Sequence, residues 1–148
     1  MRARELAQPT QLLGLDTPAL DAMRMLAASG LPGLVIALHK GFVVVPASQV
    51  LRVALPRYVL DDAALGRVFD EPSADALAAR LEGRTIADLA RSLEPDDDGP
   101  DHFVDGDANA VEIAAVMAAA HVPLVAVVDS GEFLGIVTVN QLIGSVLK

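Results

Sequence analysis

Apolar residues along the chain follow two patterns, one typical of buried strands and one typical of amphipathic helices. The runs Leu34–Leu38 and Phe42–Val45 are short, rich in β-branched residues and separated by a polar turn, which predicts a β-hairpin. Upstream, Leu20, Met23 and Leu26 recur every three residues, which places them on one face of a helix. The first third of the chain is therefore expected to fold as a helix followed by two paired strands.

The same succession of elements recurs in the last third of the chain. Asp107 repeats Asp16, and it lies 91 residues later. Beyond the hairpin the offset becomes 92, so that Gln141 repeats Gln49, because the first copy is one residue shorter there. Two copies of one unit are the strongest organisational feature of this sequence.

A short amphipathic lead-in precedes each copy, since Arg4–Ala7 matches Ala87–Ala90 at an offset of 83. We therefore predict an α/β fold with two pseudo-symmetric units, each in the order strand, helix, strand, strand, helix. The expected bounds of the units are residues 1–56 and 84–148. The residues between them, 57–83, are helical by composition and are expected to form a linker.

The segment Glu132–Leu147 carries the most suggestive local pattern. Its first half predicts a strand, and the spacing of Leu142 and Val146 predicts a helix directly after Thr138 and Asn140. A strand that turns into a helix N-terminus leaves unpaired backbone N–H groups facing outward, and such groups suit a phosphate or a sugar hydroxyl. This turn is the leading candidate for a binding site.

Composition limits the class of protein. A chain of 148 residues forms one domain, or two small halves that share a core. It contains no cysteine, which excludes a disulfide framework and a thiolate zinc site. The apolar fraction of 53% and the mean hydropathy of +0.44 are high for a soluble monomer, so we expect self-association as a homodimer.

Charge and run length narrow the function further. The net charge of −9, with Lys40 and Lys148 as the two lysines, argues against binding to a nucleic-acid backbone. The first ten residues lack the apolar region of a signal peptide, and the longest apolar runs are far too short to cross a bilayer. We therefore expect a cytoplasmic protein that is not itself embedded in a membrane.

Three stretches of the second copy, Asp107–Met117, Pro123–Asp129 and Gly135–Thr138, follow a pattern that resembles the tandem cystathionine-β-synthase (CBS) domain pair, or Bateman module. The chain also resembles the small stand-alone CBS-pair proteins of bacteria, and the resemblance covers nearly all of it apart from the middle helices. It implies two small sheets and two pseudo-symmetric clefts. It further implies binding of adenine nucleotides (AMP, ADP or ATP) and pairing into disc-like dimers.

The resemblance also points to individual residues. In the family, a Thr at the end of the last strand contacts ribose or phosphate, and an Asp three residues later takes both ribose hydroxyls. By position this implies ligand contacts from Thr138 and Gln141, with Asn140 in the same turn. The strand that opens the copy and the residues before its central strand are implied to hold the adenine, and here they are His102, Phe103, Val104, Val122 and Pro123.

Two departures from the family pattern bear on affinity. Gln141 stands where the family has Asp, and losing a charge-assisted bidentate contact would weaken binding by about 1.5–3 kcal/mol. In the first copy, Pro46 replaces the Thr and Gln49 again replaces the Asp. We therefore expect a degenerate second cleft, weak or empty, that is built on Pro46, Gln49, Leu12 and Pro32.

Each candidate ligand residue also has an ordinary structural interpretation. Thr138 can end a strand and cap the next helix, and Gln141 can be a first-turn helix residue. His102 can be a solvated loop histidine beside an acidic run. His39 is interpreted as a structural residue at the tip of a hairpin. His121 is interpreted as a structural residue at the C-terminus of a helix, where a cation suits the helix dipole.

No motif predicts catalysis, since the phosphate loop, the nucleophile elbow and the zinc-protease motif are all absent from the sequence. Asp101–Glu112 approaches the spacing of a calcium loop, but Phe103 stands at a coordinating position. We therefore predict no enzyme, no metal site and no cofactor besides a regulatory nucleotide.

Two hypotheses about function follow. In the first, the chain is a regulatory module that binds an adenine nucleotide between its two CBS motifs and signals occupancy to a separate enzyme or transporter. In the second, the clefts no longer bind, and the module serves as a structural dimerisation or docking piece. Pro46, Gln49 and Gln141 favour the second hypothesis.

Overall fold

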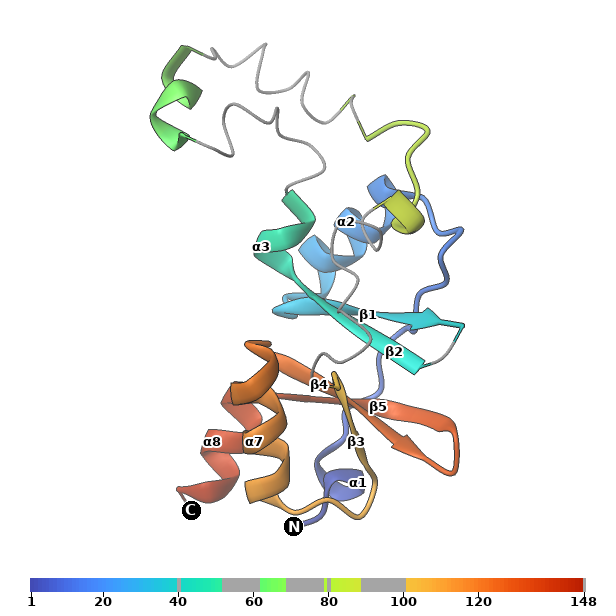
Figure 1. Ribbon diagram of the computed structural model, residues 1–148, viewed down its shortest axis with the longest axis vertical. Coiled ribbons are helices and arrows are strands. Elements are labelled where there is room, and N and C mark those ends of the chain that lie inside the picture. The colour runs from blue at the N-terminus through green and yellow to red at the C-terminus, as the bar shows by residue number, and fades with distance from the viewer. Residues whose placement is uncertain (40, 52–61, 69–78, 80, 89–100, 148) are drawn as a thin grey trace.

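The computed structural model describes residues 1–39, 41–51, 62–68, 79, 81–88 and 101–147, and these form two halves stacked along the long axis (Figure 1). The upper half in that view holds α2 (Ala19–Ser29), β1 (Gly33–Leu38), β2 (Gly41–Pro46) and α3 (Ala47–Val50). The lower half holds β3 (Phe103–Asp105), α7 (Ala110–Ala120), β4 (Leu124–Asp129), β5 (Glu132–Thr138) and α8 (Val139–Val146).

The two halves repeat one topology. In the lower half β4 pairs antiparallel with β5 and parallel with β3, and in the upper half β1 pairs antiparallel with β2. The counterpart of β3 in the upper half is a single parallel bridge between Leu13 and Ile36, 91 residues before the Val104–Val127 pair. The predicted α/β fold with two pseudo-symmetric units is confirmed.

The one-residue difference between the copies is a β-bulge. Val127 lies opposite Gly135, whereas Val128 lies opposite Phe133, so Leu134 is the extra residue of β5. The pairing of β1 with β2 runs without such a shift. The change of offset from 91 to 92 therefore arises within β5, just after the hairpin turn.

The hairpin of the upper half is buried on both faces. Val35 and Val44 are cross-strand partners that join the core of the lower half. The opposite face packs with α2 in a second cluster that includes Leu34, Ile36, Val43 and Val45. Because alternate residues of a strand point to opposite faces, burial of both faces explains the unbroken apolar run in the sequence.

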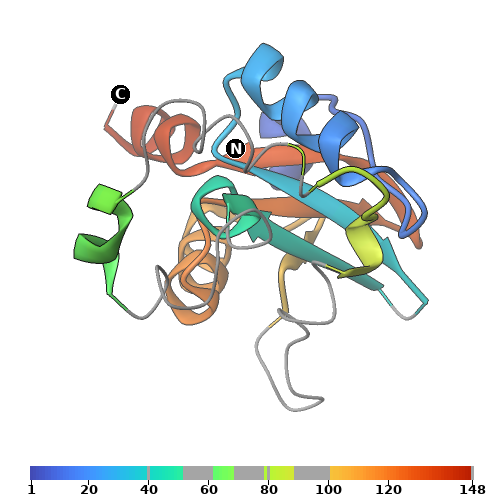
Figure 2. The same ribbon diagram turned by 90° about the horizontal axis from the view of Figure 1, so that it is seen from above.

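Aromatic side chains also join the two halves, and Figure 2 shows the upper hairpin crossing over the lower sheet. The ring of Phe42, on β2, lies 6.1 Å from the ring of Phe103 in an edge-on arrangement. It lies 5.8 Å from the ring of Phe133 on β5. The halves therefore share one core rather than touching at a hydrated boundary.

The lead-in helix α1 (Ala3–Leu6) docks on the half that lies far from it in sequence, and Figure 1 shows it beside β3. Ala3 N donates a hydrogen bond to Ala108 O at 2.8 Å. The second lead-in makes the equivalent bond in the upper half, from Ile86 N to Thr17 O at 2.8 Å. The two lead-ins are thus exchanged between the halves.

Parts of the predicted organisation lie outside the described residues. The described part of the linker contains a 3-10 helix, η2 (Ala63–Val68), while residues 57–61, 69–78 and 80, and the acidic run at 94–100, are not described. The last helix expected in the first unit is α3, which ends at Val50, and residues 52–56 of that unit are not described. The division at 1–56, 57–83 and 84–148 remains a prediction. Within the described ranges, none of the helices combines the length and apolar character needed to span a bilayer.

Candidate functional site

A cavity of about 330 Å³ lies between the two halves, at the turn from β5 into α8; we call it the central cavity. The lower half contributes Pro123, Thr138, Val139, Asn140 and Gln141, and the remaining walls are Gly30, Leu31, Pro32 and, from the N-terminal segment, Gln8. Pro32 and Pro123 occupy the same position in the two copies, so the cavity forms where the two central strands begin. Its volume falls in the range typical of small-molecule sites.

A capping box builds the turn at the floor of this cavity. Gln141 N donates to Thr138 Oγ1 at 3.3 Å, and Thr138 N donates back to Gln141 Oε1 at 3.0 Å. Val139 N donates to Pro123 O at 3.0 Å, which fixes the start of α8 against the start of β4. The structural interpretation of Thr138 and Gln141 therefore holds, and both residues also line the cavity.

Gln141 is hydrogen-bonded at both ends of its amide. While Oε1 accepts from Thr138, Nε2 donates to the carbonyl oxygen of Leu6 at 3.1 Å. An aspartate or glutamate has no N–H group, so a carboxylate at this position would lose the second bond. Gln141 thus ties the cavity to the last residue of α1.

The central cavity is polar but uncharged. Among the described residues that line it, none has a charged side chain, and the hydrogen-bonding side chains are those of Gln8, Thr138, Asn140 and Gln141. The N-terminus of α8 adds a partial positive charge from the aligned peptide dipoles. This combination suits a ligand with hydroxyl groups and a single anionic group better than one with several charges.

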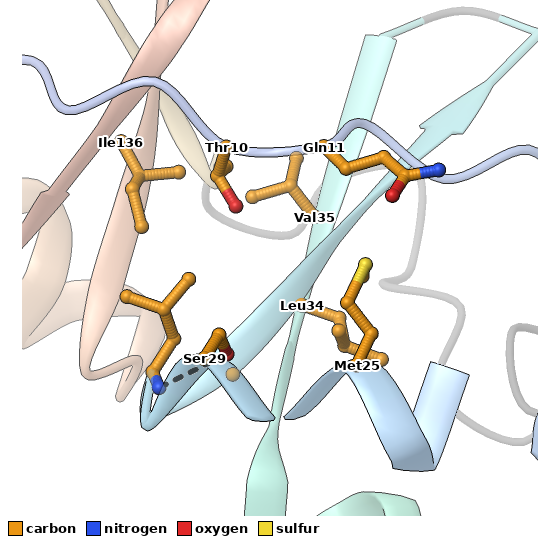
Figure 3. Close-up of a pocket in the computed structure, with 9 residues that line it drawn as sticks. Thr10, Gln11, Met25, Ser29, Leu34, Val35 and Ile136 are labelled. Atoms are coloured by element: carbon orange, nitrogen blue, oxygen red, sulfur yellow. Dashed lines mark hydrogen bonds between the residues drawn. The ribbon is translucent and has the colours of Figure 1, made fainter. Parts of the chain in front are cut away.

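A second, enclosed hollow of about 20 Å³ shares Leu31 as a wall with the central cavity. In Figure 3, Thr10 and Gln11 lie on one side of this hollow, with Met25 and Ser29 of α2 on the other. Ser29 Oγ accepts a hydrogen bond from Leu31 N at 3.2 Å, which holds the turn that follows α2. The space is about that of one water molecule, so it does not accommodate a nucleotide.

His102 lies outside the central cavity and binds the backbone of the other half. Its Nδ1 accepts a hydrogen bond from Val44 N, on β2, at 2.8 Å. Burial lowers the pKa of His102 below its ordinary value, and the carboxylate of Asp101 offsets part of that effect. The side chain therefore acts as a neutral acceptor between the halves.

Phe103 and Val104, on β3, line a different, open hollow that also contains three acidic residues, Asp105, Asp107 and Glu112. These carboxylates already have partners, since Asp105 accepts from the Asp107 backbone and Glu112 caps α7. Across the described ranges, no three acidic or histidine side chains gather closely enough to hold a metal ion.

Three of the residues predicted for the degenerate cleft, Pro32, Pro46 and Gln49, lie around the turn from β2 into α3, where Ala47 N donates to Pro32 O at 2.9 Å. Pro46 ends β2 opposite Gly33 and precedes α3 without a side-chain capping bond. Gln49 lies in α3, and Leu12 packs against the core. Pro32 also lies in the wall of the central cavity.

Of the residues predicted to contact a ligand, the structure brings together Thr138, Asn140, Gln141 and Pro123. It places the others elsewhere, namely His102, Phe103, Val104 and the core residue Val122. Sequence reasoning missed four cavity residues, which are Gln8, Gly30, Leu31 and Val139. Gly30 is the C-cap of α2 in the left-handed conformation that glycine favours, so a glycine after a helical pattern could have indicated it, whereas nothing in the repeat indicates that Gln8 reaches the opposite half.

This fold, with its duplicated unit and its cavity between the copies, defines a tandem CBS-domain pair. The family model described as the CBS domain matches residues 98–148. A CBS domain-containing protein of unknown function from Kribbella flavida is 39% identical over 100% of this chain and 99% of its own length, with a TM-score of 0.78. The chain therefore belongs to the CBS-domain proteins.

Other solved structures share the fold at low sequence identity. The CBS domain of a membrane protein from Sphaerobacter thermophilus is 18% identical, with coverage of 97% of this chain and 86% of its own and a TM-score of 0.66. The CBS-pair protein CBSX2 from Arabidopsis thaliana is 16% identical, with coverage of 99% and 94% and a TM-score of 0.68. A structure of CBSX2 in complex with AMP is also similar, at 20% identity, 99% and 96% coverage and a TM-score of 0.61. A comparison with curated proteins found no match.

Proposed function

We propose that this chain is a regulatory module that binds an adenine nucleotide in the central cavity and passes its occupancy to a separate protein. The observation that carries this proposal is the cavity itself, which gathers Thr138, Asn140 and Gln141 against residues of the other half. The AMP complex of CBSX2, a protein of the same fold, supports the choice of ligand class.

AMP is the adenine nucleotide that this cavity suits best. The described lining residues offer hydroxyl and amide groups but no cationic side chain. The partial positive charge at the N-terminus of α8 can offset the charge of a single phosphate, whereas the further charges of ADP and ATP would enter without a counter-charge. We therefore expect affinity to fall in the order AMP, ADP, ATP.

Signalling would follow from the position of the cavity between the halves. A ligand that contacts both Pro32 and Thr138 favours one relative arrangement of the two halves over others. The shift in population between two arrangements is limited by the difference in the ligand's affinity for them. We propose a separately encoded enzyme or transporter as the regulated partner, with the module in the cytoplasm and without catalytic activity of its own.

Calorimetric titration of the full chain with AMP, ADP, ATP and S-adenosylmethionine tests this function. Thr138→Ala should weaken AMP binding at least fivefold, the loss expected for one hydrogen bond of about 1 kcal/mol, and Thr138→Ser should restore it. Asn109→Ala is the matched control, because it removes the N-cap of α7 outside the cavity. Equal loss of affinity in both alanine variants would show that Thr138 acts through folding alone.

The second candidate function is a docking module whose clefts do not bind nucleotide. It is favoured by apolar side chains on the outer surface, which are Val111 on α7 and Ile143, Val146 and Leu147 around α8. We propose that these helices meet a second copy in a homodimer. Two results together would establish this function instead. Calorimetry would show no heat with any of the four compounds at millimolar concentration, and sedimentation would show a dimer that Val146→Glu dissociates.

A further inference from the structure

We propose that the N-terminal segment, residues 1–8, is a latch on the central cavity: Gln141 holds it closed through Leu6, and a ligand that takes the Gln141 side chain releases it. The release by a ligand rests on the function proposed above. The latch itself rests on contacts within this chain.

The segment forms one wall of the cavity. Gln8 lines it, and the backbone of Gln8 bridges β5 in both directions, with Gln8 N donating to Ile136 O at 2.8 Å and Ile136 N donating to Gln8 O at 2.9 Å. The approach is so close that a Cβ at Gly135 would lie 2.3 Å from Gln8 O. Displacing the segment would therefore remove a wall and expose an edge of the lower sheet.

The segment depends on tertiary contacts for its order. The helix α1 spans four residues, and a helix of one turn is not stable on its own. It is anchored at its start by the buried Ala3 and by Arg4, whose guanidinium lies 2.8 Å from Asp107 and 3.0 Å from Asp129. At its end, Gln141 Nε2 donates to Leu6 O at 3.1 Å.

Gln141 couples the contacts of the N-terminal segment to the central cavity, because it bonds the segment and also lines the cavity. Its oxygen accepts from Thr138, its nitrogen donates to Leu6, and the residue lines the space where a ligand would lie. A ligand hydroxyl that reorients this amide competes with the Leu6 carbonyl. By reciprocity, ligand binding and release of the segment favour each other.

Hydrogen exchange followed by mass spectrometry tests the latch in the full chain without any ligand. Gln141→Glu keeps an acceptor for the Thr138 backbone but has no N–H for Leu6, so the amides of Ala7 and Gln8 should exchange about fivefold faster than in the wild type. Arg4→Met, at the other end of the segment, should accelerate the same amides.

The matched control is Gln49→Glu, which makes the same substitution at the equivalent position of the other half. Its N-terminal amides should exchange at the wild-type rate. The latch is overturned when Gln141→Glu leaves the exchange of Ala7 and Gln8 unchanged, or when Gln49→Glu accelerates it equally.

A second measurement adds AMP at saturation and separates this inference from the proposed function. Faster exchange of residues 3–8 on AMP binding supports release by the ligand, and unchanged or slower exchange with binding confirmed by calorimetry overturns it. The absence of calorimetric heat overturns the proposed function and the releasing role of AMP together. The ligand-free variants still decide whether Gln141 holds the N-terminal segment closed.

Discussion

His102 and Val44 are joined by a hydrogen bond of 2.8 Å, in which the backbone N–H of Val44 donates to Nδ1 of the imidazole. The bond links the upper hairpin to the residue that precedes β3, so it connects the two halves. It requires a neutral ring with its proton on Nε2, because a protonated imidazole has N–H groups at both nitrogens and no acceptor. Protonation of His102 therefore opposes the packing of one half on the other.

The first prediction is a loss of stability below about pH 6.5 that His102 causes. Burial lowers the pKa of His102 in the folded chain, and Asp101 offsets this only in part, whereas the unfolded chain titrates near 6.5. As the pH falls below that value, the unfolded state binds a proton that the folded state does not. The free energy of unfolding should therefore decrease until the lower, folded-state pKa is passed.

Urea unfolding at pH 7.5 and pH 5.5 measures this effect. His102→Asn places an amide oxygen where Nδ1 lies and does not titrate, so its free energy of unfolding should decrease less between the two pH values than that of the wild type. His39→Asn is the control for the loss of a histidine elsewhere. If the free energy of unfolding of His102→Asn decreased between the two pH values as much as that of the wild type, the loss of stability would come from groups other than His102.

The second prediction concerns the aromatic contact between the halves. Phe42→Leu should lower the free energy of unfolding by about 1–2 kcal/mol, because it removes edge and tilted ring contacts with Phe103 and Phe133 while keeping an apolar side chain. Denaturant unfolding of Phe42→Leu, Phe133→Leu and the double variant forms a cycle. The coupling energy between the two rings should be about 0.5–1.5 kcal/mol, and strictly additive losses would show that the rings do not interact.

The third prediction compares two glycines of the C-terminal segment. Gly135→Ala should destabilise the fold by about 2 kcal/mol or more, because its Cβ would meet the backbone of Gln8 and because its φ of +156° is one that L side chains rarely adopt. Gly144→Ala, within α8, meets no atom within 4 Å and should stabilise the fold by about 0.5–1 kcal/mol. Thermal unfolding of both variants checks the signs, and a neutral Gly135→Ala would mean that the N-terminal segment does not lie against β5.

The duplicated fold could be predicted because its signal is local and repeated. The spacing of apolar residues gave the elements, and the change of offset located the extra residue that the structure shows as Leu134 in the bulge of β5. The same local signals predicted the capping turn at Thr138, since a polar residue between a strand and a helix has few other uses.

The contacts between the halves were not predictable in the same way. His102 lies 58 residues from its partner Val44, and Gln141 lies 135 residues from Leu6, so neither bond leaves a periodic trace in the sequence. The repeat shows that a lead-in precedes each copy. The spacing of 83 residues between the two lead-ins would be the same whichever half each one docks on, so it does not predict the docking. That is why Gln8 was missed as a wall of the central cavity.

The last prediction concerns Arg4, whose guanidinium forms ion pairs with Asp107 and Asp129. The side chains of Arg4, Asp107 and Asp129 are 44%, 78% and 34% exposed, respectively, so solvent and salt screen both ion pairs. Arg4→Met should therefore lower the global free energy of unfolding by no more than about 1 kcal/mol. The difference from the wild type should shrink further in 1 M NaCl, because ions screen exposed charges at this concentration over about 3 Å.

Chemical denaturation at low and high salt measures that difference, with Arg24→Met as the control for removing an exposed arginine whose ion pair lies within one helix. A loss above about 2 kcal/mol in Arg4→Met would mean that the segment folds as part of the global core rather than as a separate unit. A small global loss, together with faster local exchange at Ala7, is the result expected for a segment that opens while both halves stay folded. Such a segment can respond to the cavity without unfolding the protein.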